Sequence, residues 1–173
     1  MPFTPYHFGP SGFIGLIFRK WIDLPVFVLA NVIVDVEVLV VIFLGLGWPY
    51  HRYFHTLLGG AVIGALWGIS AYPLRGLFKR IMQLLYIPYK TSLRKMVISG
   101  ILGVWLHVFI DGLYQFDVKI FWPFKTVWLW RALHGHISEA QIKMICILFL
   151  VAAFIVYIST FIVFRKNRVK DNE

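Results

Sequence analysis

Long apolar stretches separated by short polar or basic segments dominate this chain. Four of them reach the roughly 20 residues that a helix needs to cross about 30 Å of hydrocarbon. They run over Leu24–Gly47, Tyr53–Leu74, Met96–Tyr114 and Met144–Phe164. A shorter apolar stretch, Phe8–Phe18, predicts a re-entrant or interfacial helix. The pattern predicts an all-α integral membrane protein, a helical bundle of four transmembrane helices plus an N-terminal half-length helix.

The composition agrees with this pattern and limits the number of domains. The chain has 173 residues, of which 60% are hydrophobic, and its mean hydropathy is +0.76. A soluble domain of this size could not hide so much apolar surface, whereas a helical bundle in lipid does not need to. We therefore expect a single helical membrane domain over residues 1–173, with a basic tail over residues 165–173.

The basic residues, which give the chain a net charge of +9, predict its orientation. They gather beside the apolar stretches at Arg19 and Lys20, in the segment Arg75–Lys95, and after Phe164. With four spans these clusters share one face, which the positive-inside rule makes cytoplasmic, so we expect a multi-pass protein with both termini in the cytoplasm. No folded basic domain remains to bind nucleic acid, and none is expected as a partner.

The opposite, outer face receives the turn Trp48–Arg52 and the loop Gln115–Lys143. Aromatic side chains favour the headgroup zone of a membrane, and this loop is rich in them. They include Phe121, Trp122, Phe124, Trp128 and Trp130. Its histidines, His134 and His136, are expected to be solvated, as most loop residues are.

Acids and histidines stand within or beside the predicted spans. They are Asp35, Glu37, His51, His55, His107 and Asp111. A charged side chain near the bilayer centre costs at least ~2.5–3.5 kcal/mol, so such residues usually face the protein interior and serve a site. The pairs His51/His55 and His107/Asp111 are each spaced four apart, so each pair shares a face if it lies on a helix.

Counting residues along each helix predicts that these groups can meet. We estimate the depth of each side chain in the membrane from its distance along the helix to the cytoplasmic basic residues, at ~1.5 Å per residue. By this estimate the acids and histidines named above, together with His7, lie between mid-membrane and the outer surface, on different helices. A cation is a favourable way to neutralise several carboxylates away from water, and mixed imidazole and carboxylate ligands favour zinc. The candidate ligands of this divalent metal are His7, Asp35, His51, His55, His107 and Asp111.

Asp35 and Glu37 are predicted to differ in role. Two residues apart on a regular helix, they point ~200° from one another. Asn31 shares the face of Asp35, which makes Asp35 the better ligand. Glu37 is left as a proton-accepting base, a residue that supports a ligand, or a partner of Arg52. The candidate catalytic residues are therefore Glu37 and Arg52, whose planar guanidinium suits an anionic substrate group.

Small residues on the second predicted span indicate close helix packing. Gly60, Gly64 and Gly68 recur every fourth residue, which places them on one face. Such a stripe lets helix backbones approach closely in lipid. We assign it no chemistry.

Several motifs of the chain occur together in a known order. They are the opening MPFTPYHFGP, the pair Asp35-x-Glu37, the HRxxH of His51–His55, the HxxxD of His107–Asp111 and Trp122-Pro123-Phe124. The chain resembles, over about residues 1–125, the LexA-binding, inner-membrane-associated metal-dependent hydrolases. Members often carry proline where this chain has Val34, and that proline would break the helix between the two acids.

The resemblance implies a multi-helix inner-membrane protein with a hydrolytic His/Asp metal site, and suggests a relation to zinc-dependent phospholipases C. The positions that match the polar residues of the family are His7, Asp35, His51, His55, His107 and Asp111. If binding to LexA extends to this chain, Arg75–Lys95 is the accessible cytoplasmic segment.

Two classes of function remain open at this stage. The first is a metal-dependent hydrolase acting on a phosphoester or similar bond of a membrane lipid or lipid-like small molecule at the outer leaflet. The alternative is a non-enzymatic membrane binding protein, or a proton- or ion-coupled transporter that uses the same buried acids. A lipid phosphatase with a histidine nucleophile is excluded, because Ser99 is followed by Gly100 where that signature requires arginine.

Overall fold

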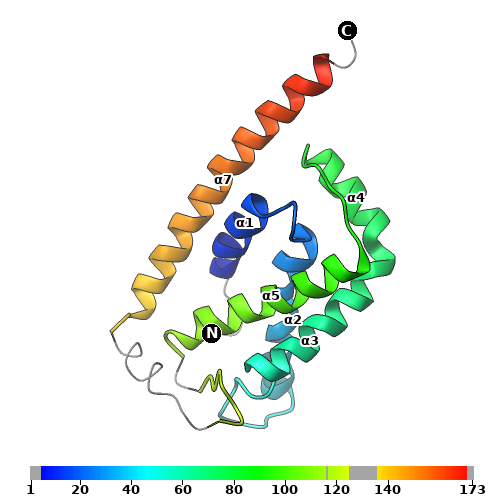
Figure 1. The fold of residues 1–173 in the computed structure, drawn as a ribbon. Coiled ribbons are helices and arrows are strands. Elements are labelled where there is room, and N and C mark those ends of the chain that lie inside the picture. The colour runs from blue at the N-terminus through cyan, green and yellow to red at the C-terminus, as the bar shows by residue number, and fades with distance from the viewer. Residues whose placement is uncertain (1–4, 116, 125–135, 171–173) are drawn as a thin grey trace.

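The computed structural model describes residues 5–115, 117–124 and 136–170, and the side chains of residues 166–170 are not among those described. Within these ranges the chain is helical without strands, which confirms the predicted all-α class. The elements in chain order (Figure 1) are η1 (Pro5–His7), α1 (Phe8–Ile17), α2 (Leu24–Phe43), α3 (Leu57–Ala71), η2 (Tyr72–Leu74), α4 (Arg75–Leu84), α5 (Leu93–Gly112) and α7 (Glu139–Lys170). Trp128, Trp130 and His134 of the predicted outer loop lie outside the described residues, whereas His136 is exposed.

Four helical stretches of the described chain are long and apolar enough to cross a membrane. They are Leu24–Phe43, Leu57–Leu84, Leu93–Gly112 and Glu139–Arg165. Short α1, with ten residues, corresponds to the predicted half-length helix. The second stretch extends beyond its predicted end at Leu74, because the 3-10 turn η2 leads directly into α4.

The start of α7 shows a capping signal that the hydropathy pattern does not contain. Helix α7 begins at Glu139, five residues before the predicted start of the span at Met144. Ser138 Oγ accepts a hydrogen bond from Gln141 N at 3.3 Å, and Ser138 N donates to Gln141 Oε1 at 2.8 Å. This reciprocal pair is a capping box, which stabilises a helix start at the polar residue before the apolar stretch.

The start of α3 corrects another prediction. His51 and His55 were expected at the beginning of the second helix, but α3 starts at Leu57 and both histidines lie in the preceding loop. Thr56 caps the helix, since its Oγ1 accepts a hydrogen bond from Gly59 N at 2.9 Å. The four-residue spacing of the two histidines therefore does not reflect a shared helix face.

Helices α3 and α5 lie side by side, and the glycine stripe explains their close approach. Gly60, Gly64 and Gly68 are all buried. A Cβ added to Gly64 would lie 2.7 Å from the backbone oxygen of Gly100 on α5. The predicted packing stripe is confirmed, and its contact is between two backbones.

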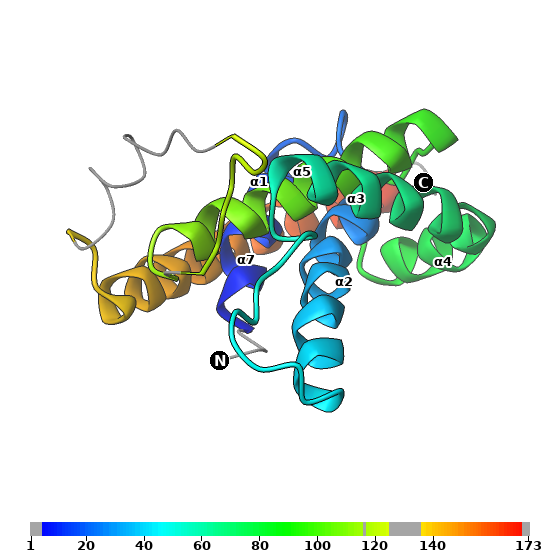
Figure 2. The ribbon, with the colours of Figure 1, turned by 90° about the horizontal axis from the view of Figure 1, so that it is seen from below.

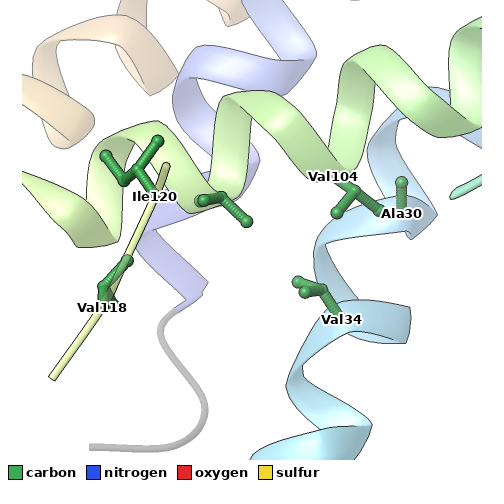
Figure 3. Close-up of a cluster of buried hydrophobic side chains, with 6 residues drawn as sticks. Ala30, Val34, Val104, Val118 and Ile120 are labelled. Carbon is green, nitrogen blue, oxygen red and sulfur yellow. The ribbon is translucent and has the colours of Figure 1, made fainter. Parts of the chain in front are cut away.

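Helix α2 does not run parallel to its neighbours. Figure 2 shows α3, α5 and α7 in one layer, whereas α2 runs out of this layer at a steep angle. A hydrophobic cluster joins the middle of α2 to α5 and to the segment after α5 (Figure 3), made of Ala30, Val34, Val104, Val108, Val118 and Ile120. This crossing brings the middle of α2 against the last turns of α5.

A second polar network fixes the N-terminal end of α2. Asp23 is fully buried, and its Oδ1 caps the helix by accepting from Val26 N at 3.3 Å. Its Oδ2 accepts hydrogen bonds from the hydroxyls of Tyr89, at 2.8 Å, and Thr91. Burial and the hydrogen bond to Asp23 raise the pKa of Tyr89. Because both oxygens of Asp23 are engaged, we interpret this network as structural.

Candidate metal centre

Four buried side chains converge where α2 crosses α5. Asp35 comes from α2, His107 and Asp111 from α5, and His55 from the loop before α3. One ligand atom from each of them lies within 4.8 Å of the others. Zinc binds imidazole nitrogen and carboxylate oxygen at about 2.0–2.2 Å in a tetrahedron, so its ligand atoms stand about 3.4 Å apart. These four residues are called the His/Asp cluster below, and their ligand atoms are spaced somewhat more widely than one bound zinc ion requires.

The Nε2 atoms of both cluster histidines lie beside the carboxylates without forming well-aligned hydrogen bonds. His107 Nε2 lies 3.2 Å from an oxygen of both Asp35 and Asp111, and His55 Nε2 lies 3.7 Å from Asp35 Oδ1. Neither nitrogen makes a hydrogen bond of acceptable geometry within the described residues. Buried polar atoms are rarely left in this state, whereas metal ligands are aimed in this way.

The charges of the cluster lead to the same conclusion. Asp35 and Asp111 are only 6% and 3% exposed. Within the described residues, the ion-pair partners of both acids are histidines, and neither acid contacts a lysine or arginine. A buried carboxylate requires a paired charge, and a divalent cation between the two acids would supply it.

His7 and His51 reach the cluster through Asp111. His7 Nε2 lies 3.0 Å from Asp111 Oδ1, and its ring stacks on that of His107 with a centroid distance of 4.2 Å. His51 Nε2 lies 3.5 Å from Asp111 Oδ2. The structure therefore brings together all six predicted ligands, four of them within joint coordination reach and these two adjacent.

Both loop histidines are oriented by a carboxylate on the other side of the ring. His51 Nδ1 lies 2.8 Å from Asp117 Oδ1, and His55 Nδ1 lies 2.9 Å from Glu37 Oε2. A carboxylate only accepts hydrogen bonds, so Nδ1 carries the proton and the lone pair of a neutral ring is at Nε2. Metal-binding histidines are usually supported in this way.

The same two carboxylates hold the loop backbone between α2 and α3. Five consecutive amides donate to them, those of residues 50 and 51 to Asp117 and those of residues 52, 53 and 54 to Glu37. Helix α2 stays regular through both of its acids, so Glu37 points away from the cluster that Asp35 enters. The oxygens of Glu37 are occupied by this loop and by His55.

Arg52 does not contact the His/Asp cluster. Its backbone nitrogen donates to Glu37 Oε2 at 3.1 Å. Its guanidinium donates to three loop carbonyls, those of Pro49 at 3.0 Å, Leu46 at 3.2 Å and Gly47 at 3.4 Å. Neither predicted catalytic residue, Glu37 or Arg52, therefore faces the centre of the cluster.

Two residues of the site were missed from sequence. Asp117 lies in the loop after α5, and Tyr114 donates from its hydroxyl to Asp111 Oδ1 at 3.1 Å. Burial acts to raise the pKa of Asp117, but hydrogen bonds from the backbone and ring of His51 outweigh it and hold the pKa below its usual value. Burial lowers the pKa of His51, which favours its neutral ring. The need of each ligand histidine for a carboxylate partner was the signal that could have found Asp117.

Fold and site together define the class of protein as an all-helical, strongly apolar chain with a buried His/Asp cluster that could hold a metal ion. In comparisons with protein-family models, curated proteins and solved structures, the chain matches none of them.

Proposed function

We propose that this protein is a membrane-bound, metal-dependent hydrolase that acts at the outer face of the membrane. The observation that carries the proposal is the pair of buried nitrogens, His55 Nε2 and His107 Nε2. They lack hydrogen bonds within the described residues and lie beside two carboxylates. A proton relay needs no such convergence of lone pairs on one point, so the geometry favours a site that holds a cation over a purely proton-coupled transporter.

In this proposal the four residues of the His/Asp cluster hold the ion, and zinc is favoured by their mixed imidazole and carboxylate donors. Such an ion supplies Lewis-acid chemistry, because it polarises a substrate oxygen and makes water more acidic. The group that accepts a proton must then lie beside the cluster rather than within it.

His51 is the residue placed for that role. Asp117 holds its Nδ1 proton, which leaves Nε2 to accept a proton from the attacking water. Water adds to the phosphorus or carbonyl carbon, the ester bond breaks, and the proton passes to the leaving oxygen. Glu37 acts as a positioning residue for His55 and for the loop, not as the base.

The membrane setting belongs to the same proposal. Large apolar side chains are exposed along α2, α3 and α7, for example Phe43 at 90% and Phe154 at 63%. Four transmembrane spans and a cytoplasmic C-terminus agree with these helices and the positive-inside rule. The expected cytoplasmic N-terminus does not fit, because His7 lies beside Asp111 at the proposed outer site. An inner-membrane location rests on the resemblance. The meeting of the motif histidines and acids supports the resemblance to the inner-membrane-associated hydrolases.

The test is to measure metal and turnover in matched variants of the detergent-purified protein. Elemental analysis of the wild type should find stoichiometric metal, and Asp35→Asn should lose it. His51→Gln should keep the metal but lose at least ~100-fold in turnover of a phosphodiester or ester substrate, as expected for loss of a general base.

Thermal unfolding of each variant identifies those that fail to fold. Absence of metal from the wild type, with none gained on incubation with zinc or manganese, would overturn the metal site. Flux of ions or protons without any hydrolysis would instead favour the transport alternative.

A further inference from the structure

A cavity of about 250 Å³ with a mixed polar and apolar lining opens on the surface beside the His/Asp cluster. We call it the outer pocket. Its lining residues are Pro49, His51, Arg52, Tyr53, Lys119 and Trp122. By contrast, the cavities along α1, α2 and α7 are lined almost wholly by apolar side chains. At ~30 Å³ per water, the outer pocket has room for about eight waters, which is enough for a phosphate group and part of its substituent.

The outer pocket is continuous with the site through one side chain. The His51 ring lines the pocket, while its Nε2 lies 3.5 Å from Asp111 Oδ2 of the cluster. A group bound in the pocket therefore contacts the residue that also touches the candidate metal ligands.

The charge of the outer pocket is positive. Arg52 and Lys119 line it, and within the described residues neither forms an ion pair with a carboxylate. Nε and Nη2 of Arg52 are held by loop carbonyls, whereas Nη1 has no acceptor among the described residues. The nearest acids, Glu37 and Asp117, do not line the pocket, because their oxygens bind the five loop amides and two histidines.

The loop backbone also fixes the position of both basic residues. Arg52 N donates to Glu37 at 3.1 Å, and the carbonyl of Ile120, next to Lys119, accepts from Leu57 N at 2.8 Å. Nη1 of Arg52 is the nitrogen left to donate to an anion, because Nε and Nη2 are bound to loop carbonyls. Lys119 adds a second positive charge on the same lining.

Two exposed aromatic side chains line the outer pocket and indicate where its ligand comes from. Tyr53 and Trp122 pack edge to face at 5.5 Å, and they are 62% and 43% exposed. Trp48 and Phe124, which are neighbours of lining residues in the sequence, are exposed as well. Such residues gather at the headgroup level of a bilayer, so the anion most accessible to this pocket is a lipid phosphate.

We propose that the outer pocket binds the phosphate group of an anionic membrane lipid, with Arg52 and Lys119 on its oxygens and His51 beside the scissile ester. The acyl chains remain in the bilayer, since the pocket volume does not admit them. This inference rests on the proposed hydrolase and names its substrate class, but phosphate binding itself can be measured without turnover.

The experiment is a calorimetric titration of the full-length detergent-purified protein. The probe is a short-chain phosphatidic acid analogue in which carbon replaces the ester oxygen at phosphorus, so that it resists hydrolysis. Lys119→Gln and Arg52→Gln should each weaken its binding by roughly tenfold or more, the usual effect of losing a hydrogen bond between charged groups. The control is Lys79→Gln, an exposed lysine on α4 that does not line the pocket, and it should bind like the wild type.

Inorganic phosphate is the second probe, and it separates a lipid ligand from a free anion. Phosphate should compete with the analogue but bind more weakly, and equal or tighter binding of phosphate would overturn the lipid assignment. Because Lys119 is exposed, Lys119→Gln keeps the test valid even if Arg52→Gln disturbs the loop. Unchanged binding in Lys119→Gln would overturn the pocket proposal.

Metal content and hydrolysis are measured on the same samples, so the two proposals can fail separately. Binding that depends on Arg52 and Lys119 in protein without metal would support the pocket and overturn the hydrolase. Metal-dependent hydrolysis with unchanged binding in both variants would support the hydrolase and overturn the pocket.

Discussion

Asp111 is the residue on which most contacts of the site meet. Its Oδ1 lies near His7 and accepts from Tyr114, and its Oδ2 lies near His51 and His107. The spacing of His107 and Asp111 on one helix predicted part of this arrangement. The contacts from His7 and His51 come from other segments, and helix periodicity says nothing about them.

Glu37 shows how a residue outside the cluster can control metal affinity. We expect Glu37→Gln to weaken metal binding by roughly 10- to 100-fold, because the ligand His55 and its loop lose a charged acceptor while the cluster itself is intact. Competition titration with a chelator measures this affinity. Glu139→Gln, which removes an exposed acid on α7, should leave affinity unchanged. Equal affinity in Glu37→Gln and the wild type would show that the loop does not support the site.

At the scale of helices, caps and backbone contacts determine where the elements begin and how closely they pack. Hydropathy placed the apolar stretches but not the caps at Thr56 and Ser138, because one polar residue barely changes an average over a window. The glycine stripe on α3 was readable, since small residues every fourth position mark a face. The surface that this stripe packs against, the backbone of α5 at Gly100, could not be read from the sequence.

We expect Gly64→Ala to destabilise the protein by about 1–3 kcal/mol, because the new methyl group would overpack the contact with the α5 backbone. Gly76→Ala is the matched control on α4. A Cβ at Gly76 has no atom within 4 Å, so this change should be neutral or stabilise by roughly 0.5–1 kcal/mol through helix propensity. Thermal unfolding in detergent compares the two variants. Equal effects would contradict the proposed close packing of α3 on α5.

At the scale of the whole molecule, the site ties together segments that lie far apart in the sequence. Ligands come from α2, the loop before α3, and α5, with His7 added from η1. A cation held by all of them would act as a cross-link between these segments. Binding to the folded state alone stabilises a protein by mass action.

Removing the metal should therefore lower the midpoint of thermal unfolding. A free metal concentration of 100 times its dissociation constant corresponds to about 2.7 kcal/mol of stabilisation. Chelator treatment of the wild type should lower the midpoint, and the same treatment of Asp35→Asn should have no further effect. A midpoint in the wild type that does not respond to chelator would contradict a cation shared by these segments.

The sequence by itself determined the all-helical class, the apolar stretches and the acids and histidines that interrupt them. These are properties of local composition and period, which a chain carries whatever its tertiary contacts. Only the tertiary structure decided that α2 crosses α5 steeply, which of its expected roles Glu37 takes by binding His55 and the loop, and that Asp117 supports His51. Those facts depend on which distant segments come into contact. Burial of apolar surface between helices determines these contacts, and it leaves no pattern within any one segment of the sequence.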